Sequence, residues 1–232
     1  MPGRCAELPD HAGAIAYALD HLIHDLSPTL FYHSVWHTRD EVVPRVEWLA
    51  KREDVSQEAR SLVKIAAYFH DLGLIQQRDG HERASAQLAR EVLPGFGYTP
   101  DQIEDIAGII LATQLPQNPH TLLEEIMADA DLDVLGRNDF FVRNRALHAE
   151  IISGGEEISV AAWLAGQVRM LRQHHYFTAT ARQDRAQRKQ QNLHILRDMA
   201  INLGWSTQSS AFARGSLGTV FHPAPSHAFL LR

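Results

Sequence analysis

The chain has 232 residues, of which 45% are hydrophobic and 22% charged, so it can bury one sizeable core. Cys5 is its only cysteine, which excludes an intramolecular disulfide and a thiolate metal site and favours a reducing, cytoplasmic location. The net charge of -6 argues against a dedicated nucleic-acid-binding protein. The first residues do not resemble a signal peptide, and no apolar run reaches the roughly 20 residues that span a membrane.

Helical periodicity runs through most of the sequence, and no segment alternates as a half-buried strand does. An all-α fold is therefore predicted, with one helical domain over residues 1–203. The Ser-, Gly-, Ala- and Pro-rich tail at 204–232 is expected to be loosely docked or partly disordered. In chain order, helices are expected at about residues 12–26, 42–52, 57–71, 81–92, 99–115, 120–135, 159–176 and 179–203.

The third expected helix is apolar almost all round, which predicts a central, buried position. His70-Asp71 lies at its end, and Gly73 is expected to terminate it. Burying an imidazole and a carboxylate costs several kcal/mol unless they are paired or bind a cation. The alternative is a His-Asp hydrogen bond that only holds the helix end. The other such pair, His24-Asp25, lies on an amphipathic helix, where its exposure costs little.

Two further segments supply candidate metal ligands. His33 and His37 are four residues apart and share a face if the segment is helical. Asp129, Asp131 and Asp133 lie in a mostly apolar segment. His, His-Asp and a distant Asp together offer nitrogen and oxygen ligands with room for water, which suits Mn, Fe, Co, Ni, Zn or Mg. Asp131 points about 200° away from Asp129 on a helix, but apolar neighbours flank both sides, so periodicity does not choose between them.

The order His, His-Asp, Asp resembles the signature of the HD superfamily of metal-dependent phosphohydrolases, and in particular a bacterial branch of undefined substrate. The similarity covers about residues 30–193. It implies an all-α HD-domain helical bundle with the metal site between central helices. It also implies that His37, His70, Asp71 and Asp131 are the metal ligands, with Asp129 as the alternative to Asp131. The matching motifs are Tyr32-His33 with His37-Thr38, residues 68–73, His81-Glu82 with Ser85-Ala86, and residues 129–137.

The resemblance also suggests groups for proton transfer. His33 resembles the histidine that protonates the leaving oxygen in cyclic-nucleotide phosphodiesterases of the superfamily, and histidine suits a general acid. Glu82 is a candidate for orienting the attacking water. The alternative for His33 is a supporting or surface position without a catalytic role. The alternative for His81-Glu82 is that both residues simply begin a helix, where an acid is stabilised. Arg185 and Lys189 belong to a basic stripe that could bind phosphate, although such a stripe is also typical of a solvated helix face.

Two departures from better-known relatives narrow the expected activity. Residues 72–76 lack the Glu-Asp pair of the guanosine tetraphosphate hydrolases. Thr113-Gln114 stands where binuclear HD proteins carry a histidine, so one divalent metal is expected, with His81 as a candidate ligand for a second. The predicted function is hydrolysis of a small phosphate ester, a nucleotide or cyclic nucleotide among them, by metal-activated water. A di-iron oxygenase and a nucleotide-binding signalling module without turnover are the alternatives. No nucleic-acid or membrane partner is expected.

Overall fold

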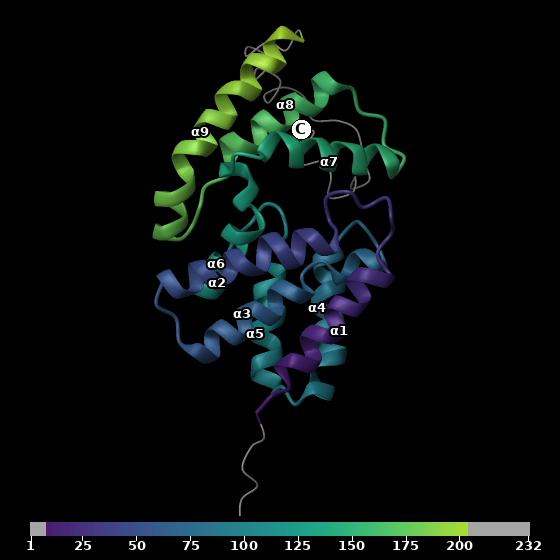
Figure 1. Ribbon diagram of the computed structural model, residues 1–232, viewed down its shortest axis with the longest axis vertical. Coiled ribbons are helices and arrows are strands. Elements are labelled where there is room, and N and C mark those ends of the chain that lie inside the picture. The colour runs from purple at the N-terminus through teal and green to yellow at the C-terminus, as the bar shows by residue number, and fades with distance from the viewer. Residues whose placement is uncertain (1–7, 204–232) are drawn as a thin grey trace, which may run out of the picture.

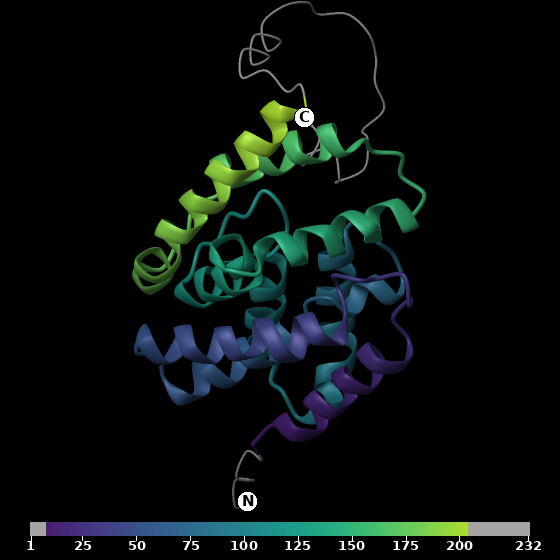
Figure 2. The same ribbon diagram turned by 45° about the horizontal axis from the view of Figure 1, so that its top comes forward.

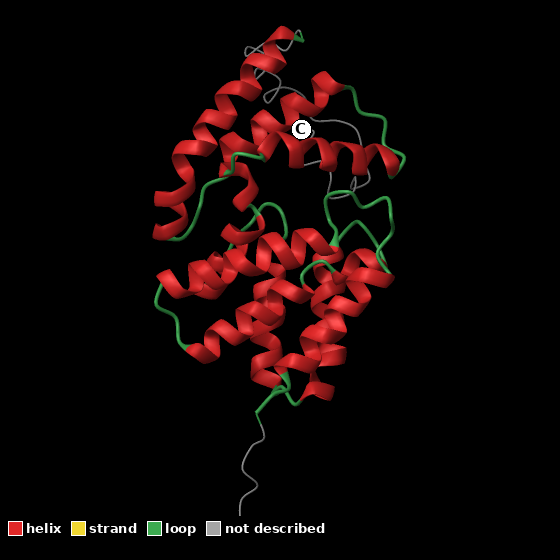
Figure 3. Ribbon diagram, viewed as in Figure 1, coloured by secondary structure: helices red, strands yellow, loops and turns green. Residues whose placement is uncertain are grey.

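The computed structural model describes residues 8–203, so the tail at 204–232 lies outside the described range. Within that range every regular element is helical, which confirms the predicted all-α class (Figures 1 and 3). None of these helices has the combination of length and apolar character that a membrane crossing requires. The α-helices are α1 (His11–His24), α2 (Val43–Arg52), α3 (Gln57–Phe69), α4 (His81–Val92), α5 (Pro100–Leu111), α6 (Leu122–Asp131), α7 (Phe140–Ser153), α8 (Val160–Gln173) and α9 (Ala179–Asn202).

Hydroxyl side chains set the starts of many of these helices. Each accepts a hydrogen bond from a backbone N–H in the first turn, which satisfies a donor that has no partner inside the helix. The sequence thereby determines where these helices begin. The residues are Ser56 for α3, Thr99 for α5, Thr121 for α6, Ser159 for α8 and Thr178 for α9.

The chain builds two apolar clusters, visible as two layers in Figures 1 and 2. The first consists mainly of α1 to α6, with α3 packed against α1, α2, α5 and α6, so the central position predicted for α3 is confirmed. The second joins α7, α8 and α9 with Tyr32 and the 3-10 turn η4 (Asp133–Gly136). The chain passes from one layer to the other directly after α6. Residues at the end of α6 therefore face both clusters.

Three local features differ from the expectations. α7 was not predicted, because polar residues such as Asn144 and Glu150 lie on its buried face and obscure the apolar periodicity. The helix expected at 120–135 divides into α6 and η4. Gly73 does not end α3, which stops at Phe69. It lies in the next 3-10 turn, where an added Cβ would come within 2.1 Å of a backbone oxygen of α4, so glycine permits close packing there.

Candidate metal centre

Three side chains from three distant parts of the chain meet where the two layers join. His37 begins the π-helix η1 (His37–Val42), His70 follows α3, and Asp131 ends α6. Asp131 Oδ1 lies 3.3 Å from His37 Nε2 and 3.6 Å from His70 Nε2. One potential ligand atom from each residue lies within 4.8 Å of the other two, so all three can reach a common ion.

Asp71 completes a compact donor set. Its Oδ2 lies 3.2 Å from His70 Nε2 and 4.0 Å from His37 Nε2. His37, His70 and Asp71 are each at most 2% exposed. Among the described residues, His70 Nε2 and Asp71 Oδ2 are buried without a hydrogen-bond partner. Buried polar atoms are normally satisfied, and a cation between them would satisfy both, so these residues fit a metal ion.

The outer nitrogens of both histidines are engaged elsewhere, which turns their Nε2 atoms toward the cluster. His70 Nδ1 donates to the carbonyl of Ala67 at 2.8 Å. His37 Nδ1 lies 3.2 Å from Glu41 Oε2, and Glu41 is held in turn by Arg137 at 2.7 Å and Arg143 at 2.9 Å. A carboxylate or carbonyl behind an imidazole is the arrangement that orients histidines as metal ligands.

The electrostatics of the cluster favour positive charge. Burial by itself would lower the pKa of His70, but the carboxylates of Asp71 and Asp131 raise that pKa well above its usual value. Burial would likewise raise the pKa of Asp131, but the neighbouring imidazoles of His37 and His70 lower it. Burial would also raise the pKa of Asp71, but His70, together with His81 and His33, holds that pKa well below its usual range. Both carboxylates are therefore ionised at neutral pH, as cation binding requires.

The neighbouring acids of the same segment have other partners. Asp129 accepts hydrogen bonds from the backbone N–H groups of Phe177 and Thr178, both at 2.8 Å, and from the Thr178 hydroxyl at 2.7 Å. Asp133 forms ion pairs with Arg45 at 2.6 Å and Arg185 at 2.7 Å. The structure therefore places Asp131 beside the histidines and commits Asp129 to the start of α9.

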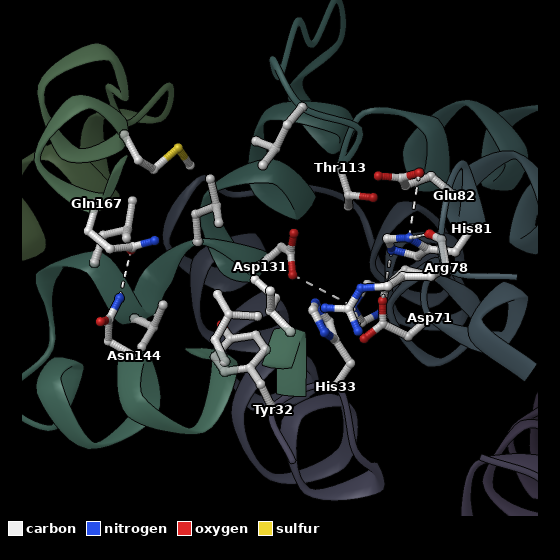
Figure 4. Close-up of a pocket in the computed structure, with 18 of the residues that line it drawn as sticks. Tyr32, His33, Asp71, Arg78, His81, Glu82, Thr113, Asp131, Asn144 and Gln167 are labelled. Atoms are coloured by element: carbon white, nitrogen blue, oxygen red, sulfur yellow. Dashed lines mark hydrogen bonds and ion pairs between the residues drawn. The ribbon is translucent and has the colours of Figure 1, made fainter. Parts of the chain in front are cut away.

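A pocket of about 160 Å³ opens from this cluster. Figure 4 shows Asp131 and His33 near its centre and Asp71, His81 and Glu82 toward one end. His81 Nε2 lies 3.5 Å from Asp71 Oδ1. The structure thus brings the two predicted proton-transfer residues, His33 and Glu82, into the same pocket as the candidate ligands.

Glu150 of α7 anchors the pocket wall. Its side chain is fully buried, and it accepts hydrogen bonds from the backbone N–H groups of Tyr32 and His33 at 2.8 and 3.0 Å. Its Oε1 lies 2.6 Å from His33 Nδ1 and 3.1 Å from Arg78 Nη2. Because Nδ1 of His33 is engaged, Nε2 is the ring atom left to hold a proton in the pocket.

The two basic residues predicted to bind substrate lie elsewhere. Arg185 is engaged with Asp133 and Asp184. Lys189 donates to the backbone oxygen of His174, and its Nζ lies 3.0 Å from His174 Nδ1. Burial lowers the pKa of Lys189 to about 8. Neither side chain lines the pocket beside the candidate ligands, whereas the guanidinium of Arg78 does.

Arg78 and Asn144, which line the pocket, and Glu150, which holds its wall, were not identified from the sequence, whereas Gln167 resembled a family position without an assigned role. For the residues of α7, the helical spacing of the sequence could have indicated one buried face. Phe140, Asn144, Leu147 and Ile151 follow helical spacing, and all four line the pocket. An asparagine in such a stripe indicates a buried polar contact, but its partner comes from another helix.

The fold and the site define an all-helical protein with a buried candidate metal centre of histidine and aspartate. Residues 40–133 match the HD domain family, a segment that contains His70, Asp71 and Asp131. The fold is similar to that of a predicted HD superfamily hydrolase from an uncultured Thermotogales bacterium, with a TM-score of 0.52 and 20% identity over 84% of this chain and 94% of the other. No curated protein matches the chain. Residues 40–133 are thus similar to the HD domain, and the fold of the described chain is that of the HD superfamily structure.

Proposed function

We propose that the chain is a metal-dependent phosphohydrolase that cleaves a small phosphate ester. The observation that carries this proposal is the cluster of buried His37, His70 and Asp71 with the partly exposed Asp131, in which two polar atoms are unsatisfied, beside a pocket of about 160 Å³. One divalent ion held by these four residues would supply Lewis-acid polarisation and activation of water. His37, His70 and Asp131 lie within common reach of one another, which supports one ion shared by these residues.

The remaining groups divide proton handling and phosphate binding between them. Glu82 borders the pocket beside His81, where its carboxylate can accept a proton from an attacking water. His33 can donate a proton from Nε2 to the leaving oxygen, because Glu150 fixes its other nitrogen. Arg78 brings a guanidinium to the pocket wall, and this group suits phosphate oxygens. In the proposal Arg78 takes the phosphate-binding role that the sequence suggested for Arg185 and Lys189.

A pair of neighbouring substitutions tests the proposal. Asp131→Asn removes a proposed ligand, whereas Asp129→Asn makes the same chemical change on the same helix outside the cluster. We expect metal analysis of the purified protein to give about one ion per chain, lost in Asp131→Asn and retained in Asp129→Asn. Phosphate release from aryl phosphates and nucleotides should follow the metal content and stop on chelation.

Two results would contradict the proposal. Retention of the ion in Asp131→Asn and in His70→Ala would overturn the ligand assignment. Phosphate release by metal-free protein would overturn the metal-dependent reaction. Two irons per chain with oxygen-dependent turnover would instead support the oxygenase alternative.

A further inference from the structure

The pocket has two chemically different ends. The ionisable groups gather at the end formed by α3, α4 and the end of α6, and Figure 4 shows Asn144 and Gln167 at the opposite end. Aliphatic and aromatic side chains line the space between, which we call the apolar arm. Its residues are Leu115, Leu132, Val134, Leu135, Phe140, Leu147, Ile151 and Met170. None of these eight residues is charged.

A chain of hydrogen bonds fixes the amide at the far end of the arm. Trp163 Nε1 donates to Asn144 Oδ1 at 2.9 Å. Indole is only a donor, so this contact determines which atom of Asn144 is the oxygen. Asn144 Nδ2 then donates to Gln167 Oε1 at 2.6 Å. Because Gln167 Oε1 accepts this hydrogen bond, the other terminal atom of Gln167 is Nε2, a donor.

Gln167 Nε2 is a buried donor that faces the pocket. Gln167 is 3% exposed, and its Nε2 is buried without a hydrogen-bond partner among residues 8–203. Figure 4 shows this nitrogen turned toward the interior of the pocket, on the side of Asp131. A buried donor without an acceptor destabilises the protein, and an acceptor on a ligand in the arm would satisfy it.

We propose that the apolar arm binds the organic part of the phosphate ester, and that this part is compact, uncharged and apolar with one hydrogen-bond acceptor for Gln167. This inference rests on the proposed phosphohydrolase activity. The size follows from the volume, because an apolar cavity of about 150 Å³ holds a benzene ring and the whole pocket measures about 160 Å³. A polyhydroxylated sugar would leave hydroxyl groups unpaired in the arm, which favours an apolar group over the ribose of a nucleoside.

Two aryl phosphates of matched shape test the inference. 4-Acetylphenyl phosphate carries a carbonyl acceptor, whereas 4-isopropylphenyl phosphate has the same outline without one. Gln167→Glu keeps the oxygen that accepts from Asn144 and removes the donor, and Gln167→Met removes both. The ratio of kcat/KM for the two esters is compared between proteins, since that comparison cancels the different reactivity of the leaving groups. Gln173→Glu, the same change at an exposed position of α8, is the matched control.

We expect the ratio of acetyl to isopropyl ester to fall about tenfold in Gln167→Glu and Gln167→Met, and to stay unchanged in Gln173→Glu. An unchanged ratio in both Gln167 variants would overturn the inference while leaving the phosphohydrolase proposal intact. Faster hydrolysis of nucleotides than of either aryl ester would also overturn it.

Binding of the products provides a readout that needs neither turnover nor a variant. Calorimetry should show tighter binding of 4-hydroxyacetophenone than of 4-isopropylphenol to the unaltered protein. Equal affinities would overturn the inference. A preference for the ketone, with neither ester hydrolysed, would support the acceptor site and contradict the proposed reaction.

Discussion

Nδ1 of His33 lies 2.6 Å from Oε1 of Glu150, a residue 117 positions further along the chain. The other carboxylate oxygen of Glu150 accepts the backbone N–H of His33 at 3.0 Å. Both the main chain and the side chain of His33 are therefore fixed by one buried carboxylate of α7. In this arrangement Glu150 is a positioning residue, since it acts on the pocket through His33.

Glu150→Gln should destabilise the protein in a pH-dependent way. Burial would raise the pKa of Glu150, but His33 and the backbone donors lower it from 4.5 to about 2. The carboxylate therefore contributes stability above about pH 4.5 that is lost as the pH falls toward 2. We expect wild type to exceed Glu150→Gln by roughly 3 kcal/mol in unfolding free energy near neutrality. Urea denaturation from pH 7 to 3 measures the difference, which should shrink below pH 4.5; a constant difference would contradict the argument.

Gly73→Ala should separate α4 from the turn that follows α3. The added Cβ would lie 2.1 Å from the backbone oxygen of His81 and 2.7 Å from the backbone nitrogen of Ser85. Relief requires backbone movement at His81 and Ser85, on either side of Glu82, so we expect a loss of roughly 2–4 kcal/mol in stability and of most activity. Gly95→Ala is the control, because nothing lies within 4 Å of its added Cβ. Equal thermal stability of the two variants would refute the packing explanation.

Glu41→Gln should weaken metal binding without removing a ligand. Glu41 contacts His37 Nδ1 and pairs with Arg137 and Arg143, so its charge orients and polarises the imidazole. Loss of such a partner lowers metal affinity about 10- to 100-fold. Competition with a chelator of known affinity measures the change. Glu47→Gln, at an exposed ion pair with Lys64, should leave the affinity unchanged, and equal effects of the two substitutions would exclude a specific role for Glu41.

Asp129→Ala should lower stability and leave metal binding intact. The substitution leaves the N–H groups of Phe177 and Thr178 without their acceptor at the start of α9. Unpaired buried donors cost about 1–3 kcal/mol each, so a loss of roughly 2–4 kcal/mol is expected in chemical denaturation. Loss of the ion from a folded Asp129→Ala protein would reopen the choice between Asp129 and Asp131.

The sequence by itself determined the helical class and the segments that carry the candidate ligands. An imidazole and a carboxylate at the end of an apolar helix must find a partner, because burial makes unpaired charge costly. That local argument distinguished His70-Asp71 from His24-Asp25, and the structure buries the first pair and leaves the second at the exposed end of α1.

Tertiary structure alone decided which acid faces the histidines and which side chains line the pocket. Both sides of α6 are buried, so periodicity carried no information on Asp129 and Asp131, whereas packing of the α9 start assigned Asp129 its partners. Glu150 and Gln167 gain their significance from contacts with residues more than twenty positions away. Such contacts depend on how the helices pack, and the helical period of each segment does not encode that arrangement.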